Sequence, residues 1–131
     1  MDGDVETHSP VDEDRLDTIC RDGFTASYLG RKDYGHSECG FVAYNMRQGG
    51  DLFLKNLRLY YASGLVFGLS EWHDSFVFDR VRQAMQIEGY KFYNISEGVP
   101  GLDVWPQTVL GEFSSHRKGP IAKRETYGEI C

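Results

Sequence analysis

The middle of the chain alternates segments of strand and helix character, and this order constrains the fold more than any other feature. Residues 40–46 are rich in β-forming side chains and are bounded by glycines, which predicts a short buried strand. Apolar side chains recur at helical spacing over 51–63 and again over 70–89, each with an acidic residue near its start. Aromatic alternation over 90–95 predicts a second strand. The order strand, helix, helix, strand predicts an α/β layer.

The flanking segments are less regular. Residues 11–19 are compatible with either a short helix or an irregular acidic segment, and the glycines between 23 and 35 predict a loop. Two prolines and three glycines between 98 and 111 predict an irregular crossing segment.

Length and composition predict one ordered domain over residues 1–131. The hydrophobic content of 40% and charged content of 26% are typical of a globular protein. No apolar stretch approaches the roughly 20 residues of a membrane span, and the N-terminus is acidic rather than basic and apolar. We therefore expect a cytoplasmic protein without a membrane span. Three cysteines without metal-ligand spacing predict reduced thiols: Cys20, Cys39 and Cys131.

The distribution of charge limits the class of partner. The net charge is −6, eight carboxylates lie within residues 1–22, and the basic residues near the end form one short cluster over 116–124. Nucleic-acid binding requires a broad basic face, so we expect no nucleic-acid partner. A small phosphorylated ligand is compatible with this pattern.

Asp74 is the most informative residue of the second predicted helix. At about 100° per residue it falls in the apolar stripe, so its carboxylate would begin the buried face of the helix. Two interpretations remain open: the carboxylate caps the helix or pairs with an arginine, or it points into a cleft and contacts sugar hydroxyls or an acceptor proton. His73 points about 100° away, which argues against a His–Asp dyad.

Two short segments near the chain ends carry residues suited to a metal and a diphosphate. Asp2 and Asp4 are separated only by a glycine, and two carboxylates so placed can share a hard cation that bridges a diphosphate. His116 precedes a flexible basic stretch whose side chains could donate hydrogen bonds to phosphate oxygens. Each segment alone is also typical of a solvated acidic end or a polar surface.

Taken in order, four segments resemble the motifs of GT-A-fold glycosyltransferases: residues 2–5, 38–45, 71–74 and 116–119. The chain is most similar to family 8, the glycogenin and bacterial galactosyltransferase group, over nearly its whole length. The resemblance implies transfer of a sugar from a nucleotide-sugar donor to a glycan or another hydroxyl acceptor. It leaves open whether the configuration of the sugar is retained or inverted.

The resemblance also implies roles for individual residues. The ligands of Mn²⁺ or Mg²⁺ would be Asp2, Asp4 and His116. The contacts to the diphosphate would be Lys118, Gly119 and Lys123. Because the usual lysine-proline-tryptophan ending of the family is absent, it stays open whether Lys118 or Lys123 corresponds to the family's diphosphate-binding lysine. Asp74 would bind the transferred sugar or the acceptor.

In this family the nucleotide base and ribose are held by strands upstream of the Asp-any-Asp motif, where this sequence has only Met1. The expected fold is therefore a partial GT-A fold, a mixed sheet with flanking helices whose upstream nucleotide-binding strands are missing. Three explanations of this absence remain open: the chain is a truncated or split version of a longer protein, a partner supplies the upstream part, or the chain has lost catalysis. The exposed sheet edge would favour a complementary N-terminal chain or a homo-oligomer.

Two other classes of function remain open. One is a non-catalytic carbohydrate-binding domain that uses the faces of Tyr44, Trp72 and Trp105. The other is an interaction domain, in which case Asp4, Asp74 and His116 would lie far apart.

Overall fold

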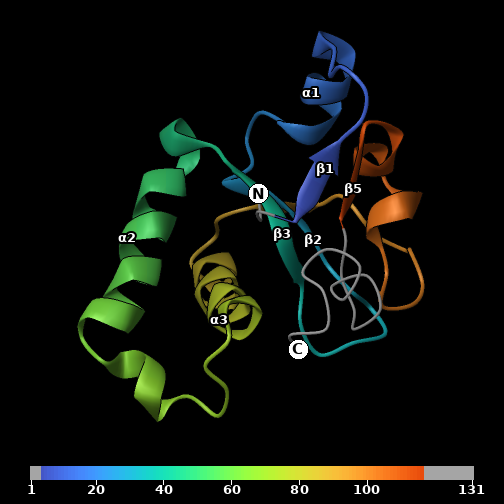
Figure 1. Ribbon diagram of the computed structural model, residues 1–131. Helices are drawn as coiled ribbons and strands as arrows, with labels where there is room; N and C mark the ends of the chain where they lie inside the picture. Colours follow the sequence, from blue (N-terminus) through green and yellow to red (C-terminus); the bar gives the residue numbers. More distant parts are fainter. Residues whose placement is uncertain (1–3, 117–131) are drawn as a thin grey trace.

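A computed structural model describes residues 4–116 as a mixed α/β fold (Figure 1). Its centre is a three-stranded mixed sheet in the order β3-β2-β4. β2 (Ala26–Leu29) pairs antiparallel with β3 (Glu38–Tyr44) and parallel with β4 (Phe92–Asn94). A separate antiparallel pair joins β1 (Val5–Thr7) to β5 (Ser114–His116). The expectation of an α/β layer is confirmed.

Helices and turns cover the two faces of the sheet. α2 (Gly50–Ala62) and α3 (Asp74–Ile87) pack on one face, around Tyr28, Phe53 and Phe78. The other face is covered by α1 (Glu13–Ile19), the β1–β5 pair and two 3-10 turns, Trp105–Gln107 and Val109–Glu112 (Figure 1). Leu29 and Trp105 lie in the apolar cluster of this second face.

The predicted elements 40–46, 51–63 and 90–95 are confirmed as β3, α2 and β4, with bounds shifted by a few residues. Residues 11–19 contain α1, so the helical alternative for that segment is confirmed. The second predicted helix begins at Asp74 instead of residue 70, because the His73 side chain accepts the N–H of Phe76 and caps the helix there.

The prediction of a loop between 23 and 35 is wrong, because this segment contains β2, the central strand. All four residues of β2 are buried, and Ser27 is satisfied by a hydrogen bond from its hydroxyl to the carbonyl of Ile19. β2 is shorter than most strands, and it is stabilised by pairing with two strands that come later in the chain.

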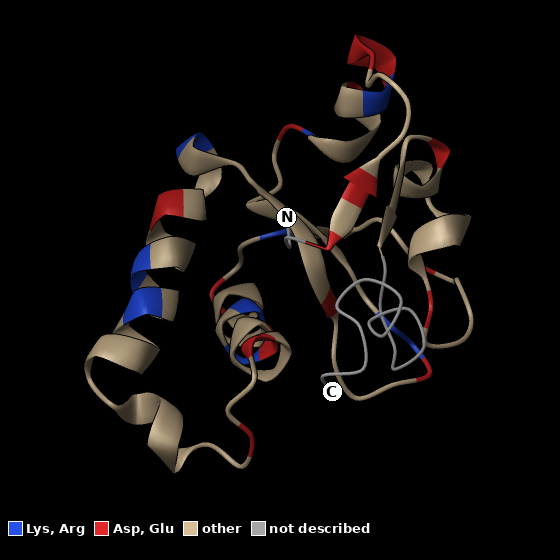
Figure 2. Ribbon diagram, in the orientation of Figure 1, with Lys and Arg blue, Asp and Glu red and all other residues tan. Residues whose placement is uncertain are grey.

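The three strands of the mixed sheet carry a single charged residue, Glu38 (Figure 2). Its side chain is almost fully buried, with 6% of its surface exposed. A buried carboxylate at the start of a strand requires partners. These partners identify the candidate site.

Among residues 4–116, no helix combines the length and the apolar character needed to cross a bilayer.

Candidate functional site

The β1–β5 ladder brings Asp4 and His116 together although 112 residues separate them. Val5 is the register partner of His116, and Asp4 directly precedes Val5. His116 Nε2 donates to Asp4 Oδ1 at 2.9 Å. Both side chains are largely enclosed, with exposed fractions of 5% for His116 and 17% for Asp4. Two of the three predicted metal ligands therefore lie in contact.

A second carboxylate lies on the opposite side of the imidazole. Glu38 Oε1 is 3.5 Å from His116 Nδ1 and also accepts the N–H of Gly40 at 2.9 Å. The other oxygen of Glu38 pairs with the guanidinium of Arg31. A histidine that ligates a metal through one nitrogen commonly donates its other N–H to a carboxylate, which fixes the ring and its tautomer. Asp4, His116 and Glu38 have the chemistry of such a ligand pair with its supporting carboxylate.

Arg31 also lines a polar cleft of about 360 Å³ at the carboxyl ends of the two parallel strands, β2 and β4. This volume is within the range of small-molecule sites, and ligands of open α/β sheets bind outside the carboxyl ends of the strands. Asn94 organises the floor, because its Oδ1 accepts the N–H groups of Gly30 and Ser96. Lys32 and Arg82 add positive charge to the lining.

Asp79 is the buried acidic residue of α3, and sequence analysis did not identify it. Its carboxylate accepts Ser37 N at 2.8 Å and Ser37 Oγ at 2.6 Å, and it pairs with Arg82 at 3.2 Å. The only sequence signal was the spacing of three residues between Asp79 and Arg82, which is common on helices. Asp79 holds the loop between β2 and β3 against α3 and forms part of the cleft wall.

Asp74 does not begin the buried face of α3 as expected. It is exposed in the first turn, where its Oδ1 accepts the N–H of Ser75. α3 packs on the face of the sheet opposite to the face on which His116 lies beside Trp105. The stripe predicted from periodicity becomes fully buried only from Val77 onward.

The remaining predicted site residues lie outside the described residues. These are Asp2, Lys118, Gly119 and Lys123. Their proposed contacts to metal and diphosphate stay predictions.

Cys39 is a poor nucleophile in this environment. Burial raises the pKa of its thiol to about 12, and the carboxylates of Asp74, Asp79 and Glu38 act in the same direction. The thiolate, which is the reactive form, is therefore scarce at neutral pH. Trp105 is only 1% exposed and cannot offer a face to a sugar, whereas Trp72 is 58% exposed.

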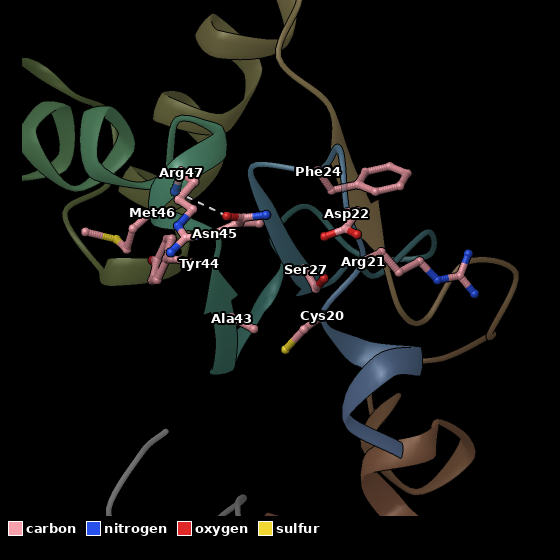
Figure 3. Close-up of a pocket in the computed structure, with 11 residues that line it drawn as sticks. Cys20, Arg21, Asp22, Phe24, Ser27, Ala43, Tyr44, Asn45, Met46 and Arg47 are labelled. Atoms are coloured by element: carbon pink, nitrogen blue, oxygen red, sulfur yellow. Dashed lines mark hydrogen bonds between the residues drawn. The ribbon is translucent and has the colours of Figure 1, made fainter. Parts of the chain in front are cut away.

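Another cavity of about 360 Å³ lies at the opposite end of the sheet, between the start of β2 and the end of β3 (Figure 3). Small side chains line it, including Ser27 and Ala43, and Arg47 N donates to Asn45 Oδ1 beside it. Arg21 lies over the ring of Tyr93, at 4.2 Å from its centroid. No acid–base or metal-ligand pair is formed among its described lining residues.

Comparisons with protein-family models, with curated proteins and with solved structures found no match to this chain.

Proposed function

We propose that the chain is a metal-dependent glycosyltransferase of GT-A type that uses a nucleotide-sugar donor. The observation that carries the proposal is the contact between Asp4 and His116, the two residues to which the resemblance to family 8 assigns one metal ion. The small mixed sheet with flanking helices is compatible with the fold that this resemblance implies.

Asp4 and His116 fit a divalent cation in chemistry and in spacing. Carboxylate and imidazole are both ligands of Mn²⁺, and donor atoms that share an ion at about 2.1 Å lie about 3 Å apart in a regular octahedral shell. The 2.9 Å between Asp4 Oδ1 and His116 Nε2 is close to that value. On metal binding the imidazole proton would move from Nε2 to Nδ1, which faces Glu38, and the lone pair of Nε2 would then be free to bind the ion beside Asp4. Asp2 would supply a further carboxylate.

The proposed catalysis is electrostatic. When bound, Mn²⁺ would supply positive charge that offsets the charge developing on the departing nucleoside diphosphate. Lys118 or Lys123 would donate hydrogen bonds to the same phosphates. The cleft lined by Arg31, Asn94 and Arg82 offers both donors and acceptors for the hydroxyl groups of a sugar. Exposed Asp74 would bind a sugar or an acceptor from the other side of β3.

The proposal is tested with the full chain, a panel of nucleotide sugars and Mn²⁺, with release of the nucleoside diphosphate as the readout. Asp4→Asn retains the size of the side chain and an oxygen that accepts a hydrogen bond, but removes the charge that binds the ion. We expect Asp4→Asn to lower Mn²⁺-dependent turnover at least about 100-fold, equivalent to about 2.7 kcal/mol of transition-state stabilisation.

Asp14→Asn is the matched control, because Asp14 is an exposed carboxylate in the first turn of α1. It should leave turnover within about twofold of the wild type. Unchanged Mn²⁺-dependent turnover in folded Asp4→Asn protein would refute the metal assignment. Glycan binding without metal and without turnover would instead favour a carbohydrate-binding domain.

A further inference from the structure

A cluster of two histidines and one glutamate lies apart from the Asp4–His116 pair. His36 belongs to the loop between β2 and β3, and Glu71 and His73 directly precede α3. Glu71 Oε2 is 2.7 Å from His36 Nε2 and 2.8 Å from His73 Nε2. All three donor atoms lie within 4.8 Å of one another. Two segments separated by 35 residues of sequence thus converge on one point.

The donor set is that of a zinc site. Two imidazoles and one carboxylate form the protein ligands of several zinc enzymes, where a fourth position is open to water or substrate. Ligands of a tetrahedral Zn²⁺ lie about 3.4 Å apart. The distances of 2.7 and 2.8 Å from Glu71 to the two imidazoles are somewhat shorter than this value, and the two imidazole nitrogens lie within 4.8 Å of each other. Imidazole nitrogen favours Zn²⁺ over Mn²⁺ or Mg²⁺, which distinguishes this cluster from the carboxylate-rich site at Asp4.

Packing positions the His36 ring for this role. Its exposed fraction is 18%, and aromatic rings contact it from three sides: Tyr34, His73 and Phe76. Among residues 4–116, its buried Nδ1 has no hydrogen-bond partner. Ring packing, with Nε2 directed at Glu71, therefore orients the imidazole. An aromatic shell around the ligands also excludes water from one side of a metal.

His73 can become a ligand at small cost. In the structure its Nδ1 accepts the N–H of Phe76 at 3.4 Å, a long hydrogen bond, while Nε2 faces Glu71. Ligation through Nε2 would place the proton on Nδ1 and end this helix cap. The free energy of zinc binding in proteins is typically several times the cost of losing one helix cap.

We propose that His36, Glu71 and His73 bind one Zn²⁺, with a fourth position open to solvent. Glu71 and His73 are 46% and 47% exposed, which leaves room for that fourth ligand. The ion would tie the β2–β3 loop to the start of α3, beside the polar cleft that His36 also lines. The site does not depend on the proposed glycosyl transfer, because none of its ligands belongs to the Asp4–His116 pair.

The test is a Zn²⁺ titration of the metal-free full chain in competition with a chromophoric chelator. The variants are His36→Gln, Glu71→Gln and His73→Asn, the last of which retains a side chain able to cap α3. Changes to supporting residues of zinc sites cost 10–100-fold in affinity, so loss of a ligand should cost at least about 100-fold. His8→Asn is the control, since His8 is exposed and directly follows β1. The Zn²⁺ affinity of this variant should match that of the wild type.

Co²⁺ provides a second readout, because tetrahedral Co²⁺ gives intense visible absorption and octahedral Co²⁺ gives weak absorption. We expect intense absorption in the wild type and in Asp4→Asn, and its loss in His36→Gln and His73→Asn. Zinc affinity unchanged by Glu71→Gln and by His73→Asn, both exposed positions that should leave folding intact, would overturn the proposal. Weak, octahedral-type absorption in the wild type would also overturn it.

Discussion

The imidazole of His116 packs against the backbone of β3 at Gly40. A Cβ atom at Gly40 would lie 2.7 Å from His116 Cε1, 2.8 Å from its Nδ1 and 3.1 Å from Glu38 Oε1. These neighbours are themselves restrained, since Glu38 pairs with Arg31 and His116 donates to Asp4. The absence of a side chain at Gly40 therefore permits the contact on which the proposed metal site depends.

Gly40→Ala should displace the imidazole and strain the sheet. We expect the free energy of unfolding in urea to fall by about 1–3 kcal/mol, the usual range for overpacking. Mn²⁺ affinity, measured by electron paramagnetic resonance, should fall with it because His116 can no longer face both carboxylates. Gly68→Ala is the control, since a Cβ there meets no atom within 4 Å. Equal stability and equal Mn²⁺ affinity in the two variants would contradict this account.

At the scale of elements, α3 and the loop before β3 are joined through Asp79. The carboxylate satisfies the backbone and side chain of Ser37 and pairs with Arg82, whose guanidinium also lies 4.8 Å from the centroid of the Tyr28 ring. Asp79 thus connects a helix, a loop and the central strand. The loop it holds is also the one that carries His36.

Asp79→Ala should destabilise the fold by about 3 kcal/mol, because it leaves the guanidinium of Arg82 and the N–H of Ser37 without a buried partner. Urea unfolding measures this loss. Asp17→Ala, which removes an exposed carboxylate of α1, should change stability by less than about 0.5 kcal/mol. A loss below about 1 kcal/mol for Asp79→Ala would show that water replaces its contacts.

Elements were predictable where local periodicity determines them. α2 and α3 bury one apolar side, and β3 is a run of β-forming residues, so the sequence identified all three. β2 is four residues within a glycine-rich stretch, and β1 and β5 are three residues each. These strands are defined by partners far away in the chain, which no local pattern shows.

At the scale of the whole molecule, the sheet separates two apolar clusters and two candidate metal sites. The Asp4–His116 contact was expected only through the family resemblance, because 112 residues separate the two. The supporting residues Glu38 and Arg31 were not expected, since their pairing arises from the tertiary fold. The His36–Glu71–His73 cluster was missed for the same reason: its residues have no metal-ligand spacing in sequence.

The two tryptophans of the chain report on this separation. The ring of Trp105 is buried, with its centroid 5.1 Å from that of His116, whereas exposed Trp72 adjoins Glu71 and His73. Paramagnetic Mn²⁺ held by Asp4 and His116 should therefore quench the fluorescence of Trp105. We expect strong quenching in Trp72→Phe protein and little quenching in Trp105→Phe protein, while diamagnetic Mg²⁺ should quench neither.

Asp4→Asn in the Trp72→Phe background provides the control, because it removes the charged ligand and leaves Trp105 in place. Quenching that survives this substitution would place Mn²⁺ elsewhere on the molecule. Quenching of Trp72 alone would locate the ion at the histidine cluster beside the start of α3. Because each single-tryptophan variant keeps a reporter beside one of the two candidate sites, the comparison shows which of them binds Mn²⁺.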